Sequence, residues 1–579
     1  MRIWDLRRGD DDDNRTSPHG GGLRRILLST ALEFNYVKAA IGFVVLIVSP
    51  VMIVGIVPSL VVTYGRLKVS AIASSAYSPI VAIVVLVILF AGAIWIGRPL
   101  LLKALENFWH LHYTLVFPAF VALREILRSV AEHFSGPTAT AEQLDRRRRL
   151  SAVFGALLFA SAGIALAIVV GLSIGLKLID VEHVRTWAVV NAALGNAAII
   201  LGLSTAAESL YWVFREFRFR APVLDWVPGA SEAATSIDRV AHLSDLHFVG
   251  ERYGCRMESG MHGPRGNRRI RLALRKLAAI HASSPLDRVL VTGDVTDAGT
   301  RAEWTEFLDM IRTVPELRDR LSFVPGNHDV NIVDRHNTGR FDLPWSAGQS
   351  LRKLRVVLAL DAIQGNRSYI VDRKSGALGP SLSNYLREPG RVELLRALAK
   401  DGAIPGRREM SKIWDTIFPL VEPPSANGGY GIILLDSNAR SHFSLTNAIG
   451  IVDPPQLKAL KSILRGSPRN SWMILLHHQI VEYPVASISL TDRIGLALVN
   501  ACDVLAAIAP HASRCLILHG HRHRDWIGTC RNVVLCSAPS VTMGSQREGK
   551  YHGSFHVHEF ALDVDGGIRL NSTERVRVS

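Results

Sequence analysis

The chain has 579 residues, of which 48% are hydrophobic, and a formal net charge of +15. Many of its arginines border long apolar stretches, where they would contact anionic lipid headgroups, and no interleaving of aromatic and basic residues accompanies them. The charge therefore does not indicate a nucleic-acid partner. The five cysteines form an odd set without disulfide spacing, which is typical of a reducing compartment.

The first 220 residues have the pattern of a membrane region. Residues 1–36 contain acidic and glycine runs and are predicted to be a disordered cytoplasmic N-terminus. Residues 37–220 contain four long apolar stretches, near 40–64, 80–96, 152–176 and 187–213. Each stretch approaches or exceeds the roughly 20 residues of a transmembrane helix. Because runs such as 81–90 are apolar on every face, we expect a bundle of about four transmembrane helices rather than buried soluble ones.

Basic residues alternate along this region. They are dense before the first span, sparse in the first loop, dense in the second, sparse in the third and dense after the fourth. Because basic residues mark cytoplasmic loops, both termini of this multi-pass inner or plasma membrane protein would face the cytoplasm. The segment 108–123 is less apolar and contains His110, His112 and Pro118, so we interpret it as an interfacial or bundle-packed helix. If it crossed the membrane, the orientation would change.

A proline-containing linker is predicted over 221–236, and five short polar motifs follow it. They are Asp245-Leu246-His247, Gly293-Asp294-Val295-Thr296-Asp297, Gly326-Asn327-His328-Asp329, His477-His478 and Gly520-His521-Arg522-His523. Each motif comes after a continuous apolar run that is typical of a buried parallel strand. Helical stretches such as 268–283 and 301–314 separate the strands, which indicates a layered α/β domain. In such sheets, ligands bind where the strands end.

Carboxylate, imidazole and amide oxygen ligands suit zinc, manganese and ferrous iron. Each motif alone has a plain structural interpretation, such as a turn for Gly-Asn-His-Asp. Their conjunction in this order favours a site for two divalent cations, of manganese, iron or zinc. We do not count His478 or His519 as ligands. Six other histidines are interpreted as ordinary surface or sheet residues: His242, His281, His511, His552, His556 and His558.

From 237 to 579 the pattern resembles the calcineurin-like metallophosphoesterase superfamily. It is most similar to the cyclic-nucleotide phosphodiesterase branch, because Thr292 to Asp297 is followed by Ala302-Glu303-Trp304 and Phe307, and because Leu435-Asp436-Ser437 and Gln456-Leu457 occur further along. The resemblance implies a four-layer α/β/β/α sandwich with a dinuclear metal site at the rims of its sheets.

The resemblance also implies the role of individual residues. Seven would be metal ligands, three for each cation and one that bridges them: Asp245, His247 and His523; Asn327, His477 and His521; and Asp294. His328 would face the substrate and help the leaving group depart, Asp329 would orient His328, and Asp297 would act from outside the ligand set. Two cations about 3.5–4 Å apart would clamp the phosphoryl oxygens and create a hydroxide nucleophile.

Two parts of this half lack a ligand motif. Residues 331–430 are expected to form either a cap that shapes substrate choice or a peripheral helical decoration. The tail is expected to contain strands at 532–535, 554–562 and 568–570 that complete the second sheet.

The resulting expectation is a membrane-anchored, dimetal-dependent phosphoesterase. By resemblance alone, diester hydrolysis is favoured over monoester hydrolysis, with a nucleotide or lipid-linked substrate. One alternative is a hydrolase of lipid-linked phosphate or pyrophosphate, because the site would be tethered near the bilayer. Another is a membrane sensor or scaffold whose phosphoesterase domain only binds. DNA phosphodiesters also stay open as a substrate class.

Overall fold

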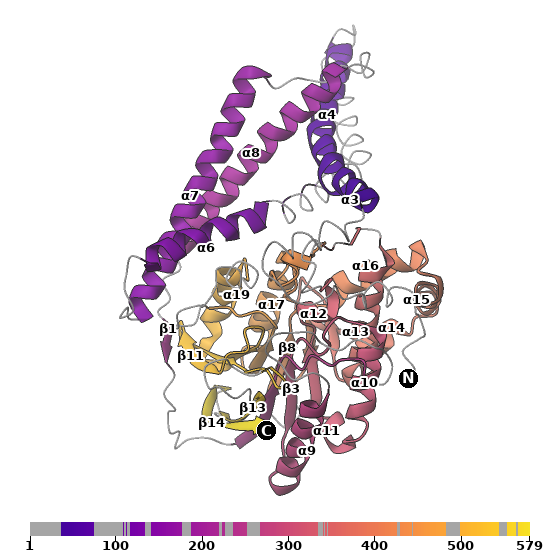
Figure 1. Cartoon of the computed structure of the whole chain (residues 1–579), viewed down its shortest axis with the longest axis vertical. Coiled ribbons are helices and arrows are strands. Elements are labelled where there is room, and N and C mark those ends of the chain that lie inside the picture. The colour runs from indigo at the N-terminus through magenta and orange to yellow at the C-terminus, as the bar shows by residue number, and fades with distance from the viewer. Residues whose placement is uncertain are drawn as a thin grey trace. The chain divides into compact units, whose positions relative to one another are not determined.

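The structure used here is a computed structural model. It describes residues 36–73, 108, 112, 116–133, 141–175, 187–218, 223–225, 236–251, 267–333, 340, 342–343, 346–424, 429–442, 444–481, 498–543, 553–562 and 566–578. The chain separates into two units (Figure 1). A helical unit is drawn from Asn35–Ala139 and Arg146–Arg220, and an α/β unit contains Ala221–Ser579.

The helical unit contains long apolar helices. The described elements are α3 Tyr36–Phe43, the π-helix η1 Val44–Val48, α4 Ser49–Ala73, α6 Phe117–His133, α7 Ala141–Ser173 and α8 Trp187–Arg218. Three segments of the described chain are long and apolar enough to cross a membrane: Ala40–Leu67, Arg149–Ser173 and Trp187–Phe214. The predicted span at 80–96 and the N-terminal 35 residues lie outside the described residues. Most of 108–116 does too, and α6 begins only at Phe117.

Small residues set the helix contacts within this unit. A side chain on Gly163 of α7 would collide with the carbonyl of Gly202 on α8, and one on Gly55 of α4 would collide with Ala193. Asn196 Nδ2 also donates to the Gly55 carbonyl at 3.3 Å. Such close backbone approach through small residues is how helices pack where no hydrophobic effect drives them together.

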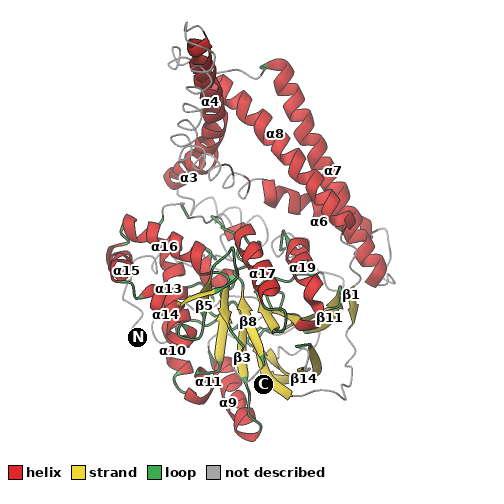
Figure 2. Cartoon of the chain, turned by 180° about the vertical axis from the view of Figure 1, so that it is seen from behind, coloured by secondary structure: helices red, strands yellow, loops and turns green. Residues whose placement is uncertain are grey.

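The α/β unit is built on two mixed sheets (Figure 2). The nine-stranded sheet has the order β1 Val223–Asp225, β11 Trp526–Cys530, β12 Val533–Ser537, β10 Cys515–His519, β9 Ser471–Leu475, β8 Tyr430–Leu434, β7 Leu420–Glu422, β5 Tyr369–Val371 and β6 Leu378–Ser381. The five-stranded sheet has the order β14 Ile568–Val578, β13 Gly553–Leu562, β2 Ser236–Leu243, β3 Arg288–Thr292 and β4 Leu321–Val324. Mixed sheets with intervening helices confirm the α/β class.

The strands that precede the motifs are parallel and buried, as their continuous apolar sequences predict. β2, β3 and β4 pair in parallel in one sheet, and β8, β9 and β10 pair in parallel in the other. The connections include four helices: α9 Arg268–Ser283, α10 Arg301–Ile311, α17 Pro454–Gly466 and α19 Ala501–Ile508. The carboxyl ends of these strands therefore supply the loops that carry the motifs.

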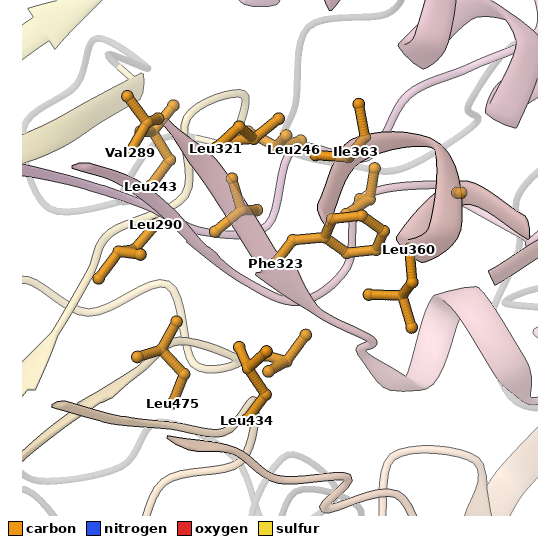
Figure 3. Packing of buried hydrophobic residues seen from close by; sticks show 14 of the residues in the cluster. Leu243, Leu246, Val289, Leu290, Leu321, Phe323, Leu360, Ile363, Leu434 and Leu475 are labelled. Carbon is orange, nitrogen blue, oxygen red and sulfur yellow. The ribbon is translucent and has the colours of Figure 1, made fainter. Parts of the chain in front are cut away.

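A common apolar core joins the two sheets. Figure 3 shows Leu290 of β3 with Leu434 of β8 and Leu475 of β9, and Phe323 of β4 beside Leu360 of the helix α13 Ala347–Gln364. Fully burying one such side chain stabilises the fold by about 1.5–3 kcal/mol. The core thus fixes the strand ends relative to one another.

Part of the insertion at 331–430 is built into the α/β fold. It contains α13 Ala347–Gln364, α14 Leu382–Leu386, α15 Pro389–Asp401 and α16 Ile404–Ile417, and its strands β5, β6 and β7 extend the nine-stranded sheet. On α13, Arg355 donates to the Gly299 carbonyl at 2.9 Å, and Arg352 donates to the Val330 carbonyl at 3.2 Å. Both acceptors follow ligand motifs, so α13 braces those loops. A role as a cap stays a prediction.

Two sequence expectations differ from the structure. Residues 223–225, expected to be linker, form β1 and pair with β11. The tail does not complete one sheet: β12 joins the nine-stranded sheet, whereas β13 and β14 join the other. Arg531 and Asn532, with φ of 52° and 65°, fold β12 back on β11 as a hairpin, which leaves the other edge of β11 open for β1.

Candidate metal centre

The five motifs lie in loops that leave neighbouring strands. Asp245 and His247 follow β2, Asp294 follows β3, and Asn327 begins the short helix α12 Asn327–Val330 after β4. His477 follows β9, and His521 and His523 follow β10. Hydrogen bonds join the loops, with His247 N donating to the Asp294 carbonyl at 3.0 Å and His521 N to Asp245 Oδ2 at 3.1 Å. The two sheets therefore contribute to one site.

The predicted ligands form two adjacent clusters. Asp245, His247 and His523 offer ligand atoms within 4.8 Å of one another, and so do Asp294, His477 and His521. Asp294 Oδ2 lies 3.4 Å from His477 Nε2 and 3.9 Å from His247 Nε2, so this oxygen faces both clusters. Asn327 Oδ1 lies 3.1 Å from His477 Nε2 and completes the second cluster.

The second cluster has the donor chemistry of a cation site. His477 Nδ1 lies 2.8 Å from the Thr292 carbonyl, which accepts a hydrogen bond from it, so in the neutral ring Nε2 carries the lone pair. That nitrogen faces Asn327 Oδ1, Asp294 Oδ2 and, at 2.9 Å, His521 Nδ1. Asn327 Oδ1 and the Asp294 carboxylate offer only lone pairs at this point, so a cation or a proton between them and the imidazoles stabilises the arrangement. The residues therefore fit a metal ion.

The pKa values of the buried groups in the centre also favour positive charge at this position. Burial lowers the pKa of His477, but Asp294 and Asp245 outweigh burial and raise this pKa to about 9. Burial acts in the opposite sense on Asp294, yet His477, His328 and His247 hold the pKa of this carboxyl well below its usual range. The proton on His477 is what a bound divalent cation would displace, since metal ligands bind deprotonated.

Backbone strain concentrates at the expected ligands. Seven non-glycine residues of the described chain have positive φ, and five of them are Asp245, His247, Asp294, His521 and His523, with φ from 48° to 73°. Each such conformation costs about 1–3 kcal/mol. The surrounding packing maintains these conformations, which direct five side chains from three loops toward one place.

Glycines let these loops approach one another. Gly293 has φ of 92°, and a side chain on it would overlap the His477 ring. A side chain on Gly326 would overlap the Asp294 carboxylate. Contact between loops thus requires the glycines that precede Asp294 and Asn327, and at Gly293 the backbone conformation requires a glycine as well.

His328 lies at the edge of the centre. Its Nδ1 lies 2.7 Å from the Asp297 carbonyl, and its Nε2 lies 4.0 Å from Asp294 Oδ2. Its side chain is 12% exposed, whereas that of His477 is fully buried. The ring can therefore reach a bound molecule.

The structure corrects the role of Asp329. Its carboxylate accepts hydrogen bonds from the backbone of Gly326, Val295 and Thr296, at 2.8–3.1 Å, and from the Thr296 hydroxyl at 2.6 Å. Both oxygens thus hold the two loops together, and the His328 ring is oriented by the Asp297 carbonyl instead. Asp297 also places Oδ1 3.5 Å from His247 Nδ1, so it contacts both imidazoles.

Some supporting residues were missed in the sequence. Ser437 Oγ accepts from the backbone N–H groups of His477 and His478, both at 3.2 Å. Ser540 Oγ donates to the Asp245 carbonyl at 2.8 Å. Ser437 belongs to the Leu-Asp-Ser motif, which could have indicated a role, but nothing near Ser540 distinguishes it. His478 is buried with its ring centroid 4.3 Å from that of His521, so it packs against the ligand set.

Comparison with known proteins agrees with this geometry. Residues 238–525 match the calcineurin-like phosphoesterase family. A Coxiella burnetii protein named "Probable cyclic nucleotide phosphodiesterase" is 31% identical over 98 residues, which is 17% of this chain and 34% of that protein. The match therefore spans about a third of the relative's length.

Two solved structures are also similar. One is a dimetal phosphatase from Danio rerio, with 14% identity, covering 59% of this chain and 99% of that chain at a TM-score of 0.30. The other is a purple acid phosphatase from yellow lupin (Lupinus luteus) seeds, with 12% identity, covering 61% and 55% at a TM-score of 0.28. The family match places a calcineurin-like phosphoesterase domain at residues 238–525.

Proposed function

We propose that the chain is a membrane-anchored phosphodiesterase that uses two divalent cations. The observation that carries the proposal is the position of Asp294 Oδ2, which faces His477 in one ligand cluster and His247 in the other. A carboxylate oxygen shared in this way is what a dinuclear centre requires of its bridging ligand. Metal binding by the two clusters and action on the leaving group by His328 can therefore be tested separately.

The ligand assignment follows the two clusters. Asp245, His247 and His523 would hold one cation, and Asn327, His477 and His521 would hold the other, with Asp294 between them. When bound, the pair supplies charge neutralisation at the phosphoryl group and activation of water. The Thr292 carbonyl holds the His477 imidazole in place by its second nitrogen.

His328 would act on the leaving group. Its Nδ1 is held by the Asp297 carbonyl, so Nε2 is the atom available to the substrate. A proton at Nε2 can pass to the departing oxygen, which matters most when that oxygen is a poor leaving group.

Diester preference and membrane attachment rest on separate observations. The name of the Coxiella relative and the motifs that surround Asp294 favour a phosphodiester, with cyclic nucleotides as the first class to test. Three described helices with the length and composition of membrane spans favour an integral membrane protein. The charge pattern of the sequence favours four spans and a cytoplasmic catalytic domain.

The test is hydrolysis by the full chain purified in detergent and supplied with Mn²⁺. Bis(p-nitrophenyl) phosphate, p-nitrophenyl phosphate and cyclic nucleotides are compared for wild type, Asp294→Ala and Asp309→Ala. Asp309 is a matched control, because its carboxylate pairs with Arg312 on the surface of α10. Diester turnover should fall more than about 100-fold in Asp294→Ala only, since even partners outside the ligand set change activity by 10–100-fold.

Two results would contradict the proposal. Equal turnover in Asp294→Ala and Asp309→Ala would remove Asp294 from the centre. Metal binding by the wild type without hydrolysis of any diester would overturn the phosphodiesterase assignment and favour a lipid-linked phosphate or pyrophosphate as substrate.

A further inference from the structure

A second group of buried histidines lies on the five-stranded sheet, outside the centre described above. His242 is on β2, and His556 and His558 are on the neighbouring strand β13, where His556 pairs directly with His242. His556 and His558 are two residues apart and so share a face of the strand. All three are at most 1% exposed, and one ring nitrogen of each lies within 4.8 Å of the others. We call this group the three-histidine cluster.

An oxygen holds one nitrogen of every ring in the cluster. His556 Nε2 lies 2.9 Å from Asp525 Oδ1, His558 Nδ1 lies 2.8 Å from Thr573 Oγ1, and His242 Nε2 lies 3.0 Å from Thr292 Oγ1. These are the carboxylate and hydroxyl partners that orient metal-binding histidines from behind. The three nitrogens left over are His556 Nδ1, His558 Nε2 and His242 Nδ1.

Two of the remaining nitrogens have the spacing of metal ligands. His242 Nδ1 and His558 Nε2 are 3.3 Å apart. Two nitrogens bound to one tetrahedral zinc ion at 2.0–2.1 Å would be separated by about 3.3 Å. A hydrogen bond between these two rings could explain their distance, but it leaves His556 Nδ1 buried with no hydrogen-bond partner in the described part of the chain. A single cation would satisfy all three nitrogens.

Two of the rings are also in the charge state that metal binding needs. Burial, together with the neighbouring histidines, lowers the pKa of His242 and of His558 well below the usual value, so both rings are neutral and carry a lone pair. Asp525 lies against His556 and supplies negative charge near the cluster. Neutral imidazoles without an inner carboxylate favour zinc and related transition metals over magnesium or calcium.

We propose that the three-histidine cluster binds a divalent transition-metal cation of the zinc class, separate from the catalytic pair. The expectation that these histidines are ordinary sheet residues is thereby revised. The cation would tie β2 to β13. Because β2 leads directly to Asp245 and His247, and because Thr292 contacts both His242 and His477, this tie would steady the catalytic loops. The proposal does not rest on the proposed substrate.

The first experiment measures metal content per chain, by inductively coupled plasma mass spectrometry, for the full protein in detergent. Wild type is compared with His558→Gln and with the control His281→Gln, whose histidine lies on α9 away from the cluster. His558→Gln should contain one cation fewer than wild type, and His281→Gln the same number. This difference does not depend on how many cations the catalytic centre holds. Equal content in a folded His558→Gln protein would overturn the proposal.

A milder variant guards against misfolding. Asp525 is partly exposed, so Asp525→Asn changes little volume in the core while weakening the support of His556. The concentration of chelating dye at which this variant loses one cation should be about 10–100-fold lower than the concentration that the wild type requires. Release at the wild-type concentration would overturn the proposal, as would the absence of an anomalous X-ray signal at the cluster in crystals of zinc-loaded wild type.

Discussion

The catalytic centre and the three-histidine cluster are both rich in histidine, but they are built in opposite ways. The centre draws its side chains from strained loops, mixes carboxylates with imidazoles, and leaves His523 with a 29% exposed side chain at its rim. The cluster draws its side chains from regular strands, has no inner carboxylate and is buried throughout. The centre, which must exchange substrate, has strained loops and an exposed rim. The cluster, which would only hold a cation, has a regular backbone.

The largest expected difference is in metal removal. A strong chelator should abolish hydrolysis of bis(p-nitrophenyl) phosphate while one cation per chain stays bound, because the cluster opens only with local unfolding of its strands. Activity should return on addition of Mn²⁺. Mass spectrometry of metal content during dialysis checks this. Loss of all cations at one common rate would break the comparison.

Removing His328 should separate chemistry from metal binding. His328→Ala should keep the full metal content and slow hydrolysis of alkyl phosphodiesters about 10²–10⁴-fold, because general acid catalysis contributes about that much. Diesters with p-nitrophenol as the leaving group need less protonation and should slow less. Paired steady-state assays give the ratio, and equal slowing of both substrates would exclude the proton-transfer role.

Asp329→Ala tests whether that carboxylate joins loops, as the structure shows, or orients His328. The change leaves three backbone N–H groups and one hydroxyl without their acceptor, and should lower the free energy of unfolding by on the order of 3 kcal/mol or more. Urea denaturation followed by tryptophan fluorescence measures this free energy of unfolding. Unchanged stability with slower hydrolysis would restore the orienting role.

Gly293→Ala and Gly429→Ala form a matched pair. Both glycines have positive φ, of 92° and 115°, so each substitution carries backbone strain of about 1 kcal/mol. Only the Gly293 side chain would collide with His477, since nothing lies within 4 Å of one on Gly429. Gly293→Ala should therefore lower metal affinity in the centre, and Gly429→Ala should not. Equal affinities in a calorimetric titration would remove the contact argument.

The smallest effect is expected at Thr573. Thr573→Val keeps the shape of the side chain but removes the hydroxyl that contacts His558. Metal affinity of the cluster should fall about tenfold, with hydrolysis unchanged at saturating metal. Competition with a chelating dye measures the affinity. A larger loss of activity than of affinity would mean that the cluster is part of the catalytic machinery.

The sequence predicts which residues of the candidate metal centre lie together because that information is local. Each ligand follows an apolar run, and parallel strands bring their carboxyl ends to one edge whatever lies between them. The resemblance assigns Asp245, His247 and His523 to one cation, and Asn327, His477 and His521 to the other, with Asp294 as the bridge. In the structure the first three lie close together, as do Asp294, His477 and His521, and the metal assignment stays a prediction.

The remaining features depend on pairing between distant segments. His242 and His558 are 316 residues apart and meet only because β2 pairs with β13, which no motif encodes. The same holds for β1, whose three residues reach the nine-stranded sheet from within a proline-containing linker. Asp329 was misassigned for a different reason, because a carboxylate beside a histidine in sequence can turn its side chain toward other loops.

The arginines of α13 have a consequence for how the centre can open. Arg355 donates a hydrogen bond to the loop after Asp297, and Arg352 donates one to the chain just after Asp329. Neither loop can swing outward unless these contacts break, so hydrogen exchange of the amides in both loops should rise and fall together with that of α13. The insertion thus restrains both loops through these two arginines. A change in its length or sequence is expected to alter the rate of product release without altering any group that contacts the phosphate.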